Sequence, residues 1–278
     1  MAYEIFGNDL VELRASSKNP SDINKDDNKS NNENESNDRI EGRNSVLEAI
    51  KAGRTIDKVF IQDGLRDGSI SSIISKLKGS GTSISFVKKQ RLDAMSETGH
   101  HQGIIAQTAS YEYSDIDDIF ALAKKRNEPP FIIILDEIED PHNLGAIIRT
   151  ANVCGAHGVI IPKHHASGLT ATVVRASAGA INFTPVVKVT NISKTIDELK
   201  QRGLWFACAD MDGDPMYKCN LTGSIGLVIG NEGSGVSRLV KEKCDYIVSI
   251  PMKGEIDSLN ASVAAGILAY EIVRQRSI

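Results

Sequence analysis

Three segments of the sequence carry residues whose types and spacing could do chemistry. Each joins an apolar run to a polar, glycine-containing loop and a helical pattern. In the first, residues 140–151, Asn143 and Arg149 are six positions apart, nearly two helical turns. The spacing predicts that an amide and a phosphate-matching guanidinium point to the same end of a site. An ordinary Asn N-cap beside a surface arginine is the alternative.

In the second segment, residues 227–236, Gly230, Gly233 and Gly235 follow the apolar run, and Glu232 supplies a carboxylate between them. Such glycines are typical of backbone that wraps a ligand, although a tight turn is the competing interpretation. The spacing matches neither the dinucleotide fingerprint nor the phosphate-binding loop. A dinucleotide-dependent oxidoreductase is therefore the least favoured class of enzyme.

Residues 250–266 form the third segment, in which Ser258 or Asn260 could cap the last helix. The small residues that follow could serve only close packing of that helix (Ala261, Ala264, Ala265 and Gly266). Each segment alone is a weak signal. Their order and internal spacing together favour a single site.

The elements that must position these segments form two predicted α/β domains. Residues 39–108 alternate helical and strand patterns and predict a small α/β/α domain with strands at 58–62, 83–87 and 104–108. Residues 109–128 read as a polar linker, and residues 129–278 as a parallel sheet whose ligand is expected at the carboxyl ends of its strands. In this second domain, strands are expected at 131–135, 158–161, 184–189, 205–209, 226–229 and 246–250, and helices near 144–154, 170–179, 192–202, 235–242 and 260–275.

The composition excludes several classes of protein. A hydrophobic content of 41% with 24% charged residues is ordinary for a globular protein, and no apolar run is long enough for a membrane span. The four cysteines form no C-x-x-C pair, which argues against a disulfide framework or a cysteine-rich zinc site and favours the cytoplasm. The histidines lack ligand-type spacing, so no metal is expected.

The net charge of −4 is unevenly distributed along the chain. Residues 21–38 carry six acidic and two basic side chains, which accounts for the entire imbalance. Residues 1–38 contain too little apolar surface to fold and predict a disordered acidic, Asn-rich extension. Residues 39–108 carry a surplus of +4, including Lys88, Lys89 and Arg91, which suits an RNA partner. A solvated charge run is the alternative.

Together the three segments resemble the SpoU/TrmH branch of the SPOUT RNA methyltransferases over residues 40–278. The matching motifs are Asn143-x-Gly145-x-x-x-Arg149, Ile229-Gly230-x-Glu232-Gly233, and Ile250-Pro251-Met252 through Ser258-Leu259-Asn260. In the small domain, Glu41-Gly42-Arg43-Asn44-x-Val46 and His101-Gln102-Gly103 resemble the bacterial subgroup that acts on large-subunit ribosomal RNA. The resemblance implies an RNA substrate-binding domain followed by a SPOUT domain with a C-terminal trefoil knot, a topology that general connection rules would reject.

The resemblance also implies an activity, a cofactor and site residues. S-adenosylmethionine would be the methyl donor, held by Gly230, Ile250 and Leu259 with neighbouring contacts from Ala209, Ile229 and Gly233. Arg149 would be the catalytic arginine, with Asn143, Glu232, Ser258 and Asn260 positioning it and the target nucleotide. The expected reaction is methylation of a guanosine ribose 2′-hydroxyl in 23S ribosomal RNA or a pre-50S particle, by a homodimer. Transfer RNA as substrate and a non-catalytic ribosome-assembly factor remain alternatives.

Overall fold

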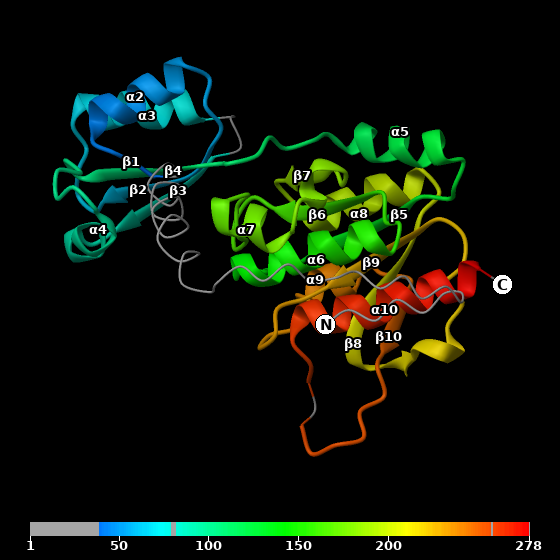
Figure 1. The fold of residues 1–278 in the computed structure, drawn as a ribbon. Helices are drawn as coiled ribbons and strands as arrows, with labels where there is room; N and C mark the ends of the chain where they lie inside the picture. Colours follow the sequence, from blue (N-terminus) through cyan, green and yellow to red (C-terminus); the bar gives the residue numbers. More distant parts are fainter. Residues whose placement is uncertain (1–38, 79–81, 257, 278) are drawn as a thin grey trace, which may run out of the picture. The chain divides into compact units, whose positions relative to one another are not determined.

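The small domain is built on a four-stranded sheet in the order β1-β4-β2-β3. β2 and β3 are parallel, and the other two pairings are antiparallel. The helices α2 and α3 bury one face of the sheet, while α4 covers part of the other (Figure 1). The predicted α/β/α layers are therefore confirmed. The elements are β1 (Arg39–Glu41), α2 (Arg43–Lys51), β2 (Ile56–Gln62), α3 (Gly68–Leu77), β3 (Ser83–Val87), α4 (Lys89–Met95) and β4 (Ile104–Thr108).

The second domain has a six-stranded sheet, all of whose pairings are parallel, in the order β10-β8-β9-β5-β6-β7. Every residue of β5 and β9 is buried, as expected for parallel strands covered on both faces. The strands are β5 (Phe131–Leu135), β6 (Gly158–Pro162), β7 (Val186–Val189), β8 (Trp205–Pro215), β9 (Ile225–Ile229) and β10 (Tyr246–Ser249). The helices are α5 (Ile116–Arg126), α6 (Pro141–Val153), α7 (Ala171–Ala176), α8 (Ile192–Gln201), α9 (Arg238–Lys241) and α10 (Ala261–Arg276), with 3-10 turns at Ala180–Asn182 and Met216–Lys218.

Alternate residues of β5 divide the core of this domain into two layers. Ile133 faces the layer that contains α6, α7 and α10, whereas Ile132 and Ile134 face the layer that contains α5, α8 and α9. The helices α6 and α10 pack against each other on the same side of the sheet. This places the first and third chemical segments together, although they are more than a hundred residues apart in the sequence.

The computed structural model describes residues 39–78, 82–256 and 258–277. The expectation of a disordered acidic extension over residues 1–38 lies outside them. Within these ranges, no helix combines the length and the apolar character needed to cross a membrane.

The segment expected to be a linker, residues 109–128, contains the helix α5. Its sequence carries apolar residues at helical spacing, and Ile119 is fully buried against the layer of α8. Asp115 and Asp118 form a reciprocal capping box at its start, and Asn127 ends it in the left-handed conformation. Residues 116–126 of the expected linker therefore form a helix that packs against the second domain.

A buried ion pair joins β2 of the small domain to β7 of the second domain. Lys188 Nζ donates to Asp57 Oδ1 at 2.5 Å, and Tyr113 Oη donates to the same oxygen at 2.6 Å. The Asp57 side chain is 4% exposed, and its other oxygen, Oδ2, has no partner among the described residues. A Cβ at Gly168 would lie 2.2 Å from that oxygen, so a side chain there would displace the Asp57 carboxylate. Burial raises the pKa of Tyr113, which keeps the phenol a donor.

Candidate active site

Residues 209–212 of β8, the carboxyl ends of β9 and β10 and the start of α10 surround a cavity of about 340 Å³. This is the edge at which a parallel sheet places ligands. The second and third chemical segments meet there, as the sequence predicts. Glu232 and Ser258 line the cavity together with all six residues that the resemblance implies as cofactor contacts, namely Ala209, Ile229, Gly230, Gly233, Ile250 and Leu259.

Gly230 closes one wall of the cavity by a contact between backbones. A Cβ at this position would lie 2.1 Å from the carbonyl carbon of Gly235 and 2.3 Å from the nitrogen of Val236. The backbones of Asn231 and Gly235 exchange hydrogen bonds of 3.1 and 2.9 Å, and Gly235 has a φ of +68°. The loop is therefore both a tight turn and a cavity wall, so the two interpretations of its glycines are compatible.

Asn231 fixes this loop to the rest of the domain. Its Oδ1 accepts a hydrogen bond from the Gly233 amide at 2.8 Å, and its Nδ2 donates to the carbonyl of Glu137 at 3.1 Å. Glu137 itself has a φ of +61°, an uncommon conformation for a residue with a side chain. The prediction of site residues missed Asn231. The available signal was an Asn directly after a strand, a typical start of a side-chain-capped turn.

Asn143, Glu232 and Asn260 form one hydrogen-bonded network from three segments. Asn143 Nδ2 donates to Glu232 Oε1 at 3.0 Å, and Asn260 Nδ2 donates to Asn143 Oδ1 at 2.9 Å and also to Glu232 Oε1. Asn260 Oδ1 meanwhile accepts from the amides of Ser262 and Val263, which makes it the N-cap of α10. The alternative role of Asn260 as a helix cap is thus real, and the same side chain serves both purposes.

The Glu232 carboxylate lies at the amino end of α10, where the helix dipole favours a negative charge. Its Oε1 also accepts from the Ala261 amide at 3.2 Å. No described residue donates to its other oxygen, Oε2, and the side chain is exposed. The network therefore holds a carboxylate in one orientation with one oxygen free. Such a group can accept a hydrogen bond from a hydroxyl or a guanidinium.

Residues 130–270 match the family model described as the SpoU rRNA Methylase family, and residues 39–114 match the model described as RNA 2'-O ribose methyltransferase substrate binding. The chain belongs to the SpoU methylase family. The two matches correspond to the two folded domains, and the SPOUT class of fold expected from the sequence is confirmed.

Relatives and solved structures agree with this assignment. The chain is 47% identical over 242 residues to YacO of Bacillus subtilis, named as a TrmH family tRNA/rRNA methyltransferase, which covers 86% of this chain and 96% of YacO. The SpoU methyltransferase AviRb of Streptomyces viridochromogenes, solved with S-adenosylmethionine, is 27% identical to this chain with a TM-score of 0.54. The alignment covers 85% of this chain and 89% of the AviRb chain. A TrmH/SpoU tRNA modifying enzyme of A. aeolicus is 28% identical with a TM-score of 0.50, covering 56% of this chain and 85% of its own.

SpoU methylases use S-adenosylmethionine, and the cavity fits this cofactor. Its walls combine backbone around Gly230 and Gly233 with the apolar side chains of Ile229, Ile250 and Leu259. Exposed backbone groups can bind an adenine edge, and apolar walls can hold its face. When bound, S-adenosylmethionine supplies an electrophilic methyl group on a sulfonium. The chain's own residues must then bind the donor and orient the acceptor.

Asp210, in the middle of β8, adds a negative charge to the cavity wall. Its Oδ2 lies 2.8 Å from Lys241 Nζ, and its Oδ1 accepts from the Asp212 amide at 3.0 Å. Partial burial acts to raise the pKa of Asp210, but these hydrogen bonds outweigh burial and lower it. The carboxylate is thus ionised and partnered. Lys241, which the prediction of site residues missed, holds it in place from α9.

The structure does not bring Arg149 or Ser258 into the amide–carboxylate network. A step of six residues along a helix corresponds to about one and two thirds turns, so the two side chains point in different directions. Accordingly Asn143 is buried on α6 whereas Arg149 is exposed, with no hydrogen bond or ion pair to the described part of the chain. Ser258 lines the cavity but makes no hydrogen bond to a described residue. Both side chains are accessible to a substrate.

Proposed function

We propose that this protein transfers a methyl group from S-adenosylmethionine to the ribose 2′-hydroxyl of a guanosine in 23S ribosomal RNA, as an enzyme of the RlmB type. The observation that carries the proposal is the small domain, since residues 39–114 match a substrate-binding model described for 2'-O ribose methyltransferases. Its surplus of positive charge suits RNA. The free thiols of the four cysteines support a site of action in the cytoplasm, on ribosomal RNA or a pre-50S particle.

The proposed mechanism assigns separate tasks to the site residues. A ribose 2′-hydroxyl is a poor nucleophile, so the enzyme must align it with the methyl group and remove its proton. Arg149 orients the ribose phosphate, and a phosphate oxygen or a transiently neutral guanidine accepts the proton. The free oxygen of Glu232 accepts a hydrogen bond from either the nucleotide or Arg149. Asn143 and Asn260 hold that carboxylate, and Ser258 contacts the nucleotide from the cavity rim.

Two other functions remain as alternatives. Methylation of transfer RNA is supported by the A. aeolicus tRNA modifying enzyme, but that enzyme covers only 56% of this chain, a share close to the methyltransferase domain alone. A non-catalytic ribosome-assembly factor is disfavoured because Asn143, Glu232 and Asn260 are hydrogen-bonded to one another beside the cofactor cavity.

Mapping the modified nucleotide tests the proposal directly. Transcripts of 23S ribosomal RNA and of transfer RNAs are incubated with the protein and S-adenosylmethionine labelled on its methyl group. We expect label in the 23S transcript alone, in a single dinucleotide that resists alkaline hydrolysis because its 2′-hydroxyl is blocked. Label in an alkali-sensitive nucleotide or only in transfer RNA would refute the assignment. Binding of S-adenosylmethionine without any transfer would favour the assembly factor.

We also propose that the enzyme is a homodimer that pairs through α10. Among the apolar residues of this helix, Ile272 is fully buried in the core, whereas Val263 is 47% and Tyr270 is 51% exposed. The exposed apolar residues are thus available to a second copy. Sedimentation equilibrium at micromolar concentration is expected to give twice the mass of the chain, and Tyr270→Glu is expected to shift the protein to the monomer. A wild-type monomer at this concentration would contradict the proposal.

A further inference from the structure

We propose that the open side of the small sheet, where α4 leaves a polar row uncovered, binds the sugar–phosphate backbone of the RNA substrate. We call Arg39, Gln107, Lys58 and the neighbouring Arg91 the open row. The inference rests on the proposed function, in that it takes RNA as the substrate. It goes further by naming the surface and the side chains that contact the phosphates.

The strand register places the side chains of the open row on one face. Gln107 of β4 is directly opposite Arg39 of β1 and Lys58 of β2, and directly paired residues point to the same side of a sheet. The next row on this face contains Ile105 and Phe60, which Leu92 of α4 covers. Because α4 has only seven residues, its cover ends there. Arg39 is therefore exposed, and Lys58 and Gln107 are half-buried.

Two cations of the open row share an aromatic support. Lys58 Nζ lies 5.1 Å and Arg91 Cζ 5.9 Å from the centre of the Phe60 ring. That ring is only 6% exposed because these side chains and α4 cover it. Long cationic side chains commonly lay their stems on apolar surface and keep their charge in water. Neither Lys58 nor Arg91 has a carboxylate partner among the described residues, so both charges are available to a ligand.

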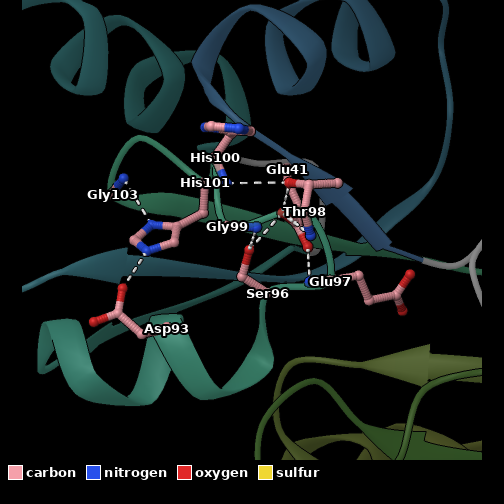
Figure 2. Close-up of polar contacts among 9 residues, drawn as sticks. All are labelled: Glu41, Asp93, Ser96, Glu97, Thr98, Gly99, His100, His101 and Gly103. Atoms are coloured by element: carbon pink, nitrogen blue, oxygen red, sulfur yellow. Dashed lines mark hydrogen bonds and ion pairs between the residues drawn. The ribbon is translucent and has the colours of Figure 1, made fainter.

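Of the acidic residues near this face, Glu41 and Asp93 are hydrogen-bonded within the domain (Figure 2), and the Glu97 carboxylate lies 3.9 Å from Arg39 of the open row. Glu41 accepts hydrogen bonds from the Ser96 hydroxyl and the Glu97 amide, both at 2.7 Å, and from Thr98. Asp93 is bound to the ring of His101 at 2.9 Å. With Arg39 paired to Glu97, the cations of the open row that have no carboxylate partner among the described residues are Lys58 and Arg91.

The same contacts hold the loop beside the open row in one conformation. The His101 ring accepts from the Gly103 amide at 3.0 Å as well as contacting Asp93, so both its nitrogens are used (Figure 2). Gln102 has a φ of +50°, and its carbonyl accepts from Arg43 Nε at 3.1 Å. The loop from Ser96 to Gly103 is thus shaped before any ligand arrives. A preformed surface binds RNA without the cost of ordering the loop.

The spacing of the open row suits a polyanion. Neighbouring strands lie about 4.8 Å apart, so Arg39 and Lys58, separated by β4, start about 10 Å from each other. Their side chains can contact different phosphates of one RNA strand. The pKa of His164, which lies next to this sheet through a 3.1 Å contact with Ser83, is lowered by burial and then by surrounding cations that include Lys58. Lys58 is thus one of several cations that act on His164.

The salt dependence of RNA binding tests the open row. The double variant Lys58→Gln/Arg91→Gln keeps the side-chain stems but removes both charges, and binding to a 23S ribosomal RNA transcript is measured by filter retention over a series of KCl concentrations. Each phosphate contact contributes about 0.7 to 0.9 to the slope of log K against log salt. We expect the slope to fall by about 1.5 and the affinity by roughly tenfold or more at low salt. The single variant Lys58→Gln should lose about half of that slope.

Lys76→Gln is the matched control, because Lys76 is exposed on α3, which covers the opposite face of the sheet. Calorimetry of S-adenosylmethionine binding and a melting curve for each variant should match the wild type. Two outcomes would refute the open row and leave the proposed function standing, provided that the wild-type protein binds and methylates the transcript. In the first, the double variant keeps the wild-type slope. In the second, Lys76→Gln loses as much slope as the double variant. If the wild type binds no transcript, the proposed function fails and the inference with it.

Discussion

Replacing Arg149 by alanine is expected to lower the rate of methyl transfer by about 10²- to 10⁴-fold, the usual contribution of a group that assists proton transfer or stabilises charge in the transition state. S-adenosylmethionine binding should not change, because Arg149 does not line the cofactor cavity. Its exposed side chain is free of protein partners among the described residues, so removing it costs little stability. The effect should therefore appear in methyl transfer to RNA and not in cofactor binding or stability.

Single-turnover methylation of the 23S transcript, with RNA and cofactor both saturating, measures this step. Arg149→Lys retains the charge but loses the two-pronged geometry of the guanidinium, and is expected to fall between the alanine variant and the wild type. Arg202→Ala provides the control, since Arg202 ends α8 on the other side of the sheet and pairs with Asp117 on the surface. Full activity of Arg149→Ala would remove Arg149 from the mechanism.

The second large effect is expected at Gly230, where alanine should weaken S-adenosylmethionine binding by about 30-fold or more. An added Cβ would overlap the backbone of Gly235 and Val236, which cannot move aside as a flexible side chain could. The loop must shift, at a cost of about 2 kcal/mol or more, and the cavity wall shifts with it. Because the overlap is within the wall, the loss should appear as a weaker cofactor affinity before any RNA is added.

Isothermal titration calorimetry of S-adenosylmethionine with Gly230→Ala gives this affinity. Gly254→Ala is the control, because an added Cβ at Gly254 meets no atom within 4 Å and its φ is not in the left-handed region. A melting curve separates loss of the cofactor wall from loss of the fold. Wild-type cofactor affinity in Gly230→Ala would show that the wall next to Gly235 does not contact the ligand.

Much of the fold follows from short-range patterns in the sequence. The strands β3, β4 and β5 begin and end where the sequence predicts. Four of their six ends stand next to a glycine, a proline or a charged residue, namely Lys88, Gly103, Pro130 and Asp136. β8 extends to Pro215, well beyond the predicted end at Ala209. Its added part is polar and is held by pairing with β10, as between Asp214 and Val248. A partner that far along the chain leaves no local signal.

The site shows the same division between local and long-range information. The sequence alone indicates that residues 140–151, 227–236 and 250–266 act together, because each ends a parallel strand or begins the helix that follows. The contact between Asn143 and Asn260 joins residues 117 positions apart and depends on α10 packing against α6. A six-residue interval does not return to the same side of a helix, and accordingly Asn143 is buried and Arg149 exposed on α6.

The buried pair of Asp57 and Lys188 limits how the two domains could be exchanged between enzymes. A chimera that takes its substrate-binding domain from a relative without the aspartate would leave the lysine buried and uncompensated. Breaking such a pair typically costs 3–5 kcal/mol, a large part of the 5–15 kcal/mol that holds a typical protein together. Gly168 adds a second constraint, since its missing side chain makes the space that Asp57 fills. A functional graft must therefore carry all three positions together, so new RNA specificity is easier to obtain by changing residues within the small domain than by replacing it.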